Sequence, residues 1–173
     1  MSTIKTTNIT HGSNSGTSNV ILASDGKVTV PQNKLVCPGV PIQVVTDSAN
    51  AAVTCSDTTA IDITGLSASI TASHANNIIL AWMTVGGIYS AANANDAVEL
   101  QLVRDSSIVA KAINIGMGSV WSLNLMGFLM YSGAAGDTNA HTYKGMFRNR
   151  QSGNVKVGQV EATHFITLME IAQ

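Results

Sequence analysis

The chain has few charged and few aromatic residues. Only 11% of its 173 residues are Asp, Glu, Lys or Arg, 5% are aromatic, and the formal net charge is -1. Typical soluble domains carry about 25% charged residues, and surfaces that bind nucleic acid need clustered positive charge. The composition therefore argues against a nucleic-acid partner. It also weakens repulsion between copies of the chain, which favours side-by-side packing in an assembly.

The chain also has few cysteines and no long apolar run. Cys37 and Cys55 are the only cysteines, and their separation fits no Cys-x-x-Cys motif, so we expect buried free thiols. The longest apolar stretches, 78–83 and 125–131, are much shorter than the about 20 residues of a membrane-spanning helix, which predicts no membrane insertion. The first residues lack a basic and apolar leader pattern. We therefore expect synthesis and folding in the cytoplasm of the producing cell.

Side chains that carry catalytic or metal chemistry are dispersed along the chain. The histidines are His11, His74, His141 and His164. Their spacing matches no metal-binding motif, and no nucleophile is evident beside them. The acidic residues form no evident pair of the kind used in glycoside hydrolysis. We therefore expect a protein that is not an enzyme, with no catalytic residues, no metal and no cofactor.

Three basic residues cluster on or just after one predicted strand. They are Lys144, Arg148 and Arg150. Because cross-strand pairs of opposite charge are favourable, we expect them to pair with Glu161 or Glu170, or to contact an acidic partner surface.

Ser, Thr, Asn and Gly are abundant, and they separate many short apolar runs. The runs lie at 42–46, 60–64, 66–71, 77–89, 98–104, 108–114, 119–132, 140–148, 155–157 and 163–171. Within 98–103, for example, apolar residues recur at every second position rather than with a helical period. Eight or more such strands with turn residues between them predict an all-β fold, an antiparallel β-sandwich of the jelly-roll type.

Residues 1–40 differ in composition from the head domain that we place at 41–173. In this N-terminal segment the runs 20–22 and 27–30 flank Asp25-Gly26, which is a hairpin signal. A lone hairpin is marginally stable in water. We therefore expect an extended arm that docks on a larger particle, followed by a proline-bracketed connector. The apolar residues expected to dock are Ile4, Ile9, Val20, Leu22, Val28 and Val30.

Two predicted strands are apolar on both faces. In 163–171 the side chains of Phe165, Met169 and Ile171 alternate with those of Ile166 and Leu168. The segment 120–131 repeats this pattern. A sandwich strand needs only one apolar face, so we predict that the second face covers a partner subunit. Sequence alone leaves open which face is which. The residues expected in the core or the subunit interface are Leu125, Phe128, Met130, Phe165, Ile166, Leu168, Met169 and Ile171.

The opening residues 2–12 (STIKTTNITHG) and 20–30 (VILASDGKVTV) resemble the start of structural proteins of marine tailed phages, particularly those of cyanophage type. The head is similar as well, through 61–67 (IDITGLS), 76–80 (NNIIL) and 165–171 (FITLMEI). The resemblance covers most of the chain. It implies a virion protein whose first segment attaches it to other capsid or tail proteins.

The heads of such proteins are similar in pattern to the trimeric jelly rolls of the tumour necrosis factor and complement globular head type. In these trimers a hydrophobic C-terminal strand lies near the threefold axis. The resemblance therefore implies a homotrimer, with Phe165, Leu168, Met169 and Ile171 in the core or at the axis and Phe128 and Met130 beside them.

Three functions remain open at this point. The chain lacks the long shaft of many phage fibres, which favours a capsid decoration or cement protein. A short tail fibre or tail-tip protein that binds a host receptor or glycan is the alternative. A lectin-like carbohydrate-binding module, with Trp82, Trp121 and Tyr143 as aromatic candidates, is a more distant one, because core packing explains such residues equally well.

Overall fold

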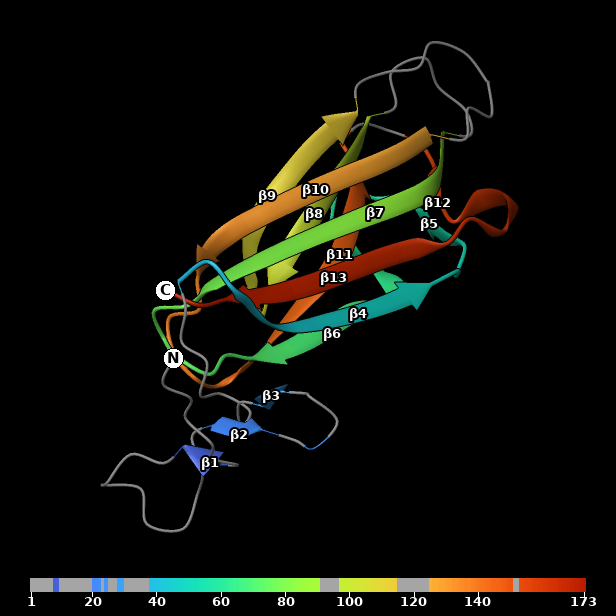
Figure 1. Ribbon diagram of the computed structural model, residues 1–173. Helices are drawn as coiled ribbons and strands as arrows, with labels where there is room; N and C mark the ends of the chain where they lie inside the picture. Colours follow the sequence, from blue (N-terminus) through green and yellow to red (C-terminus); the bar gives the residue numbers. More distant parts are fainter. Residues whose placement is uncertain are drawn as a thin grey trace.

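The computed structural model describes residues 8–9, 20–22, 24, 28–29, 38–90, 97–114, 125–150 and 153–173 (Figure 1). The strands of the head are β4 (Pro41–Ala49), β5 (Val53–Cys55), β6 (Ile61–Thr71), β7 (Ile78–Ser90), β8 (Val98–Arg104), β9 (Ser107–Asn114), β10 (Leu125–Ala134), β11 (Ala140–Asn149), β12 (Val155–Val157) and β13 (His164–Ile171). One 3-10 turn, η1 (Gln159–Glu161), precedes the last strand. No α-helix occurs in the described ranges, and none of their helices is long and apolar enough to cross a membrane.

Two antiparallel sheets pack face to face. The first sheet has the order β4-β13-β7-β10, with the short strands β12 and β5 continuing from the end of β7. The second sheet has the order β6-β11-β8-β9. Apart from the β8–β9 hairpin, the chain passes from one sheet to the other between successive long strands (Figure 1). Eight long strands wound in this way form a jelly roll, so the predicted fold is confirmed.

The sequence predicts two strands at 60–64 and 66–71 where the structure has the single strand β6. Gly65, at a φ of 80°, allows the break in regular pairing at this point, because a side chain disfavours that backbone conformation. The pairing with β11 shifts between Lys144 and Met146. As a result, Ile63 and Leu66 both face the interior although they are an odd number of residues apart.

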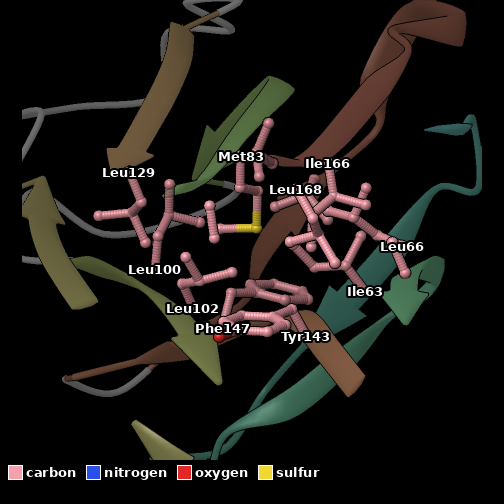
Figure 2. Close-up of a cluster of buried hydrophobic side chains, with 14 of the residues drawn as sticks. Ile63, Leu66, Met83, Leu100, Leu102, Leu129, Tyr143, Phe147, Ile166 and Leu168 are labelled. Carbon is pink, nitrogen blue, oxygen red and sulfur yellow. The ribbon is translucent and has the colours of Figure 1, made fainter. Parts of the chain in front are cut away.

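The core lies between the two sheets (Figure 2). Its largest fully buried side chains include Met83 and Ile166 from the first sheet and Tyr143 and Phe147 from the second. Cys55 is buried at the edge of this core, and its Sγ donates a hydrogen bond to the carbonyl oxygen of Asp57 at 3.2 Å. Cys37 lies outside the described residues.

Part of the N-terminal arm forms a separate small sheet. Its strands are β1 (Asn8–Ile9), β2 (Val20–Leu22) and β3 (Val28–Thr29), in the order β1-β2-β3. The antiparallel pairing of β2 with β3 is the predicted hairpin, whereas β1 was not predicted. Of the expected docking residues, Ile9, Val20, Leu22 and Val28 belong to these strands. Ile4 and Val30 lie outside the described residues.

Candidate assembly surface

The outer face of the first sheet is built from four rows of side chains that run across its strands. Read from β13 through β7 to β10, the rows are Phe165–Thr84–Phe128, Thr167–Trp82–Met130, Met169–Leu80–Ser132 and Ile171–Ile78–Ala134. Strand β4 adds Val44, Thr46 and Ser48 opposite the β13 members of three of these rows. Directly paired residues point to the same side of a sheet. We call this set of residues, together with Met126, the apolar face.

The apolar face contains no charged residue, and five of its large hydrophobic side chains are exposed to solvent in the single chain. The exposed fractions are 73% for Met126, 62% for Met130, 58% for Phe128, 54% for Val44 and 47% for Phe165. Strands lie about 4.8 Å apart and rise about 3.4 Å per residue, so the backbone under these rows covers on the order of 300 Å², and side chains extend beyond it. Exposed apolar patches of this size on monomers often mark interaction sites.

The structure assigns the two faces of the last strand that the sequence left open. Ile166 and Leu168 are fully buried between the sheets (Figure 2), whereas Phe165, Met169 and Ile171 lie on the apolar face. The same division holds for β10. Phe128 and Met130 lie on the apolar face and Leu129 lies in the core, while Leu125 begins the strand and its side chain is not described.

The outer face of the second sheet has the opposite character. Arg148 lies directly opposite Glu99 in the β11–β8 register and binds its carboxylate through Nε and Nη2, at 3.1 and 3.0 Å. Arg150 approaches the same carboxylate at 3.5 Å, and Lys144 pairs with Asp62 at 2.7 Å. We call this surface, with its Ser and Thr side chains, the polar face.

These ion pairs correct the prediction that the basic residues pair with Glu161 or Glu170. Glu99 and Asp62 are the partners because both lie on the same face of the second sheet as the basic residues. Burial would raise the pKa of Glu99, but hydrogen bonds from Arg148 and Gln101, together with the charges of Arg148 and Lys111, outweigh it and hold the pKa below its usual value.

Glu170 is a buried carboxylate on the core side of β13, and its hydrogen-bonding capacity is used within the head. Oε1 accepts hydrogen bonds from the backbone N–H and hydroxyl of Ser73 and from Asn77 Nδ2, each at 2.7 Å, and Oε2 accepts one from Gln43 Nε2 at 2.6 Å. Burial would raise the pKa of Glu170, but these donors hold it below the usual value. The residue joins β13 to the β6–β7 loop, which is a structural role.

His164 is also buried, at the opposite end of the same strand. Its Nδ1 accepts a hydrogen bond from the Gly86 N–H at 3.2 Å, and its Nε2 lies 3.4 Å from the carbonyl oxygen of Ala51. This pattern fits a neutral ring with its proton on Nε2. Burial lowers the pKa of His164, although the contact with Ala51 raises it in part.

The residues considered for metal binding and for sugar binding do not form a common site in the described part of the chain. Within the described ranges, no three His, Cys, Asp or Glu side chains are placed to hold a metal ion. Tyr143 is fully buried in the core, Trp82 is half-buried in the apolar face, and Trp121 lies outside the described residues. Because Tyr143 is not accessible, the aromatic platform considered for a lectin-like module is incomplete.

No protein-family model and no curated protein matches the sequence. Among solved structures, the chain is similar to the insecticidal delta-endotoxin Cry8Ea1 from Bacillus thuringiensis, with 14% identity, a TM-score of 0.37, and coverage of 77% of this chain and 20% of the toxin. It is similar to the infectious bursal disease virus VP2 subviral particle, with 13% identity, a TM-score of 0.41, and coverage of 79% and 38%. It is also similar to the Eiger TNF from S. frugiperda, with 10% identity, a TM-score of 0.36, and coverage of 75% and 94%.

This chain therefore spans less than half the length of the first two of these proteins. At such low identity and TM-score, the similarities carry no conclusion about function. The assignment of the jelly roll depends on the strand order of the chain itself.

Proposed function

We propose that the chain is a non-enzymatic structural protein of a phage virion that forms a homotrimer through the apolar face. Its arm, residues 1–40, holds it on the particle, and its jelly-roll head is displayed as a capsid decoration or cement protein. The observation that supports self-association is the apolar face itself, which spans four strands and is left open in the single chain. The phage and trimer elements rest on the sequence resemblance.

A second copy of the chain suits this face for a physical reason. Burial of charge in an interface carries a desolvation cost of several kcal/mol per ion, and none of the four rows contains a charged residue. Apolar area removed from water contributes about 25 cal/mol per Å². A closed ring of copies lets every protomer cover this face, whereas an open array would leave one face exposed at its end.

The small N-terminal sheet supports attachment through the arm. Its strands contain only two or three residues each. Sheets of this size are marginal in water unless they pack on something larger. In the proposed virion, a capsid protein supplies that surface.

A short tail fibre or tail-tip protein that contacts a host receptor or glycan is the second candidate. The observation in its favour is the run of exposed hydroxyl side chains on the polar face, which includes Ser67, Ser69 and Thr71 on β6 and Thr142 on β11. Such groups donate and accept hydrogen bonds without a net charge.

Two measurements test these proposals. Light scattering on the full-length protein should give three times the chain mass of 18.0 kDa; a monomer at micromolar concentration would contradict the self-association. Antibody-gold labelling of purified particles should then label the capsid. Labelling confined to the tail would replace the decoration role with host contact, and unlabelled particles would contradict a virion role altogether.

A further inference from the structure

One histidine ring lies between two carboxylates that come from different loops. His141 is the second residue of β11, and its Nδ1 lies 2.7 Å from Oδ2 of Asp105 in the β8–β9 turn. Its Nε2 lies 3.0 Å from Oδ1 of Asp137 in the β10–β11 loop. The ring thus connects three segments at one end of the sandwich.

The protonation of the ring decides how many of these contacts are hydrogen bonds. A carboxylate only accepts, and a neutral imidazole carries a single N–H, so both contacts are favourable only when both nitrogens of His141 are protonated. After loss of one proton, a nitrogen lone pair faces a carboxylate oxygen. Ring and backbone donors hold both carboxylates charged. The His141 ring and then the Thr142 N–H lower the pKa of Asp105, and the Asn139 N–H and then the His141 ring lower the pKa of Asp137.

The two links are unequal. Asp105 is also fixed to β11 by its backbone, since its N–H donates to the Thr142 carbonyl at 2.7 Å and its Oδ1 accepts from the Thr142 N–H at 3.0 Å. The Asp137 carboxylate, by contrast, accepts a hydrogen bond from the N–H of Asn139, which belongs to its own loop. Loss of one ring proton should therefore open the Asp137 link first.

The loop that contains Asp137 is joined to the rest of this end of the head. Ala135 N–H donates to Asn77 O at 2.8 Å and Gly136 N–H donates to Ala75 O at 2.9 Å. Asn77 in turn accepts from the N–H of Gln173 at 3.2 Å. The preceding residue, Ala172, accepts from the N–H of Gly39 at 2.8 Å, where the arm enters the head.

Two further ionisable side chains, those of Arg104 and His74, lie on segments at the same end of the sandwich as His141. Arg104 donates to the carbonyl oxygens of Ala134 and Ala135 and adds positive charge near Asp105. His74, in the β6–β7 loop, accepts the Asn76 N–H through Nδ1 at 3.2 Å. Arg104 stays charged at all relevant pH values, so it supplies no switch. His74 is a second titratable ring and requires a control.

We propose that His141 is a proton-dependent clasp. It holds the β10–β11 loop to the β8–β9 turn when both ring nitrogens carry protons, and it releases Asp137 when one proton is lost. The end of the head that receives the arm is then more rigid in mild acid than in mild alkali. This inference does not depend on the virion role or on the trimer.

Amide hydrogen exchange of the full-length protein tests the clasp. Protection of the Ala135 and Gly136 amides, corrected for intrinsic exchange, should fall by about three- to tenfold between pH 5.5 and pH 8.5, since a single hydrogen bond of this kind is lost. In His141→Gln and in Asp137→Asn the fall should disappear. In His74→Gln it should remain.

Several results would overturn the clasp. A wild-type protein without the fall would do so, and so would an Asp137→Asn protein that keeps it. A fall that disappears in His74→Gln would assign the effect to the other ring. Because Asp137 has an exposed side chain, Asp137→Asn should still fold. This variant therefore tests the clasp even if His141→Gln does not fold.

Discussion

The two outer faces of the sandwich are made by strands of similar length and opposite chemistry. The apolar face presents Phe128, Met130 and Phe165 to solvent and contains no charge, whereas the polar face arranges its charges in pairs such as Lys144–Asp62 and Arg148–Glu99. A sandwich needs apolar residues only toward its interior. The polar face is therefore suited to contact with water, whereas the apolar face leaves large hydrophobic side chains exposed in the single chain. The predictions below test this difference in order of expected effect.

The largest effect should distinguish the two sides of β13. Leu168→Asp places a charge between the sheets, where an unpaired ion costs several kcal/mol, and should prevent folding. Phe165→Asp, three residues earlier on the apolar face, should leave the head folded and remove self-association. Circular dichroism melting and light scattering of both variants measure this. A folded Leu168→Asp protein would contradict the placement of this residue in the core.

The next effect compares one exposed residue from each sheet. Phe128 and Ile108 are similarly exposed, at 58% and 53%, but Ile108 lies on β9 in the second sheet. In the proposed trimer, three aspartates at this position would have to be desolvated together in the interface, so Phe128→Asp should be monomeric. Ile108→Asp should remain trimeric. If both variants lose the trimer, the interface extends to β9 and is not confined to the apolar face.

Sequence pattern predicted the long strands of the head, missed the short strands β1 and β5, and left open which side of β13 faces the core. Alternation at 98–103 predicted β8, and it is a strand with Leu100 and Leu102 toward the core. Glu99 and Gln101 point to the opposite side of the sheet, yet they are buried as well, with Glu99 against Arg148. In β13 both sides are largely apolar, the charged Glu170 shares a side with Ile166 and Leu168, and the sequence left open which side faces the core. The side that contains Glu170 is the core side, because Glu170 receives hydrogen bonds from residues 93 to 127 positions away in the chain. No local pattern contains such donors.

The candidate surface shows the same limit. The sequence placed Phe128, Met130, Phe165 and Met169 among the core or interface residues, but only the pairing of β13, β7 and β10 assembles them into one face with Leu80 and Trp82. The charge partners of the second sheet were mispredicted for a related reason. Arg148 meets Glu99 through a register between strands 49 residues apart. Residue spacing along the chain does not encode that register.

A smaller effect should separate two ion pairs within the polar face. Arg148→Gln removes both hydrogen bonds to a nearly buried carboxylate and should lower the free energy of unfolding by about 1–3 kcal/mol. Lys144→Gln removes a pair whose acid, Asp62, is more than half exposed, and should cost less than about 1 kcal/mol. Urea denaturation of both variants gives the comparison. Equal losses would mean that burial of Glu99 does not set the strength of its pairing.

The smallest effect is a pH dependence that originates in the first sheet. Burial lowers the pKa of His164 in the folded state, so the unfolded chain binds a proton more readily, and stability should decline as pH falls below about 6.5. Because the unfolded chain takes up one more proton than the folded chain at this site, the free energy of unfolding can change by at most about 1.4 kcal/mol per pH unit. Glu99 and Glu170, whose pKa values are lowered, should add to the loss only below about pH 4.5.

Urea denaturation midpoints measured between pH 7.5 and pH 5 report the effect of the histidine alone, because the two carboxylates contribute only at lower pH. The decline should persist in His74→Gln and be smaller in His164→Gln, because glutamine does not take up a proton in the unfolded chain. A decline that His164→Gln retains unchanged would mean that the His164 ring does not set the acid sensitivity of the head.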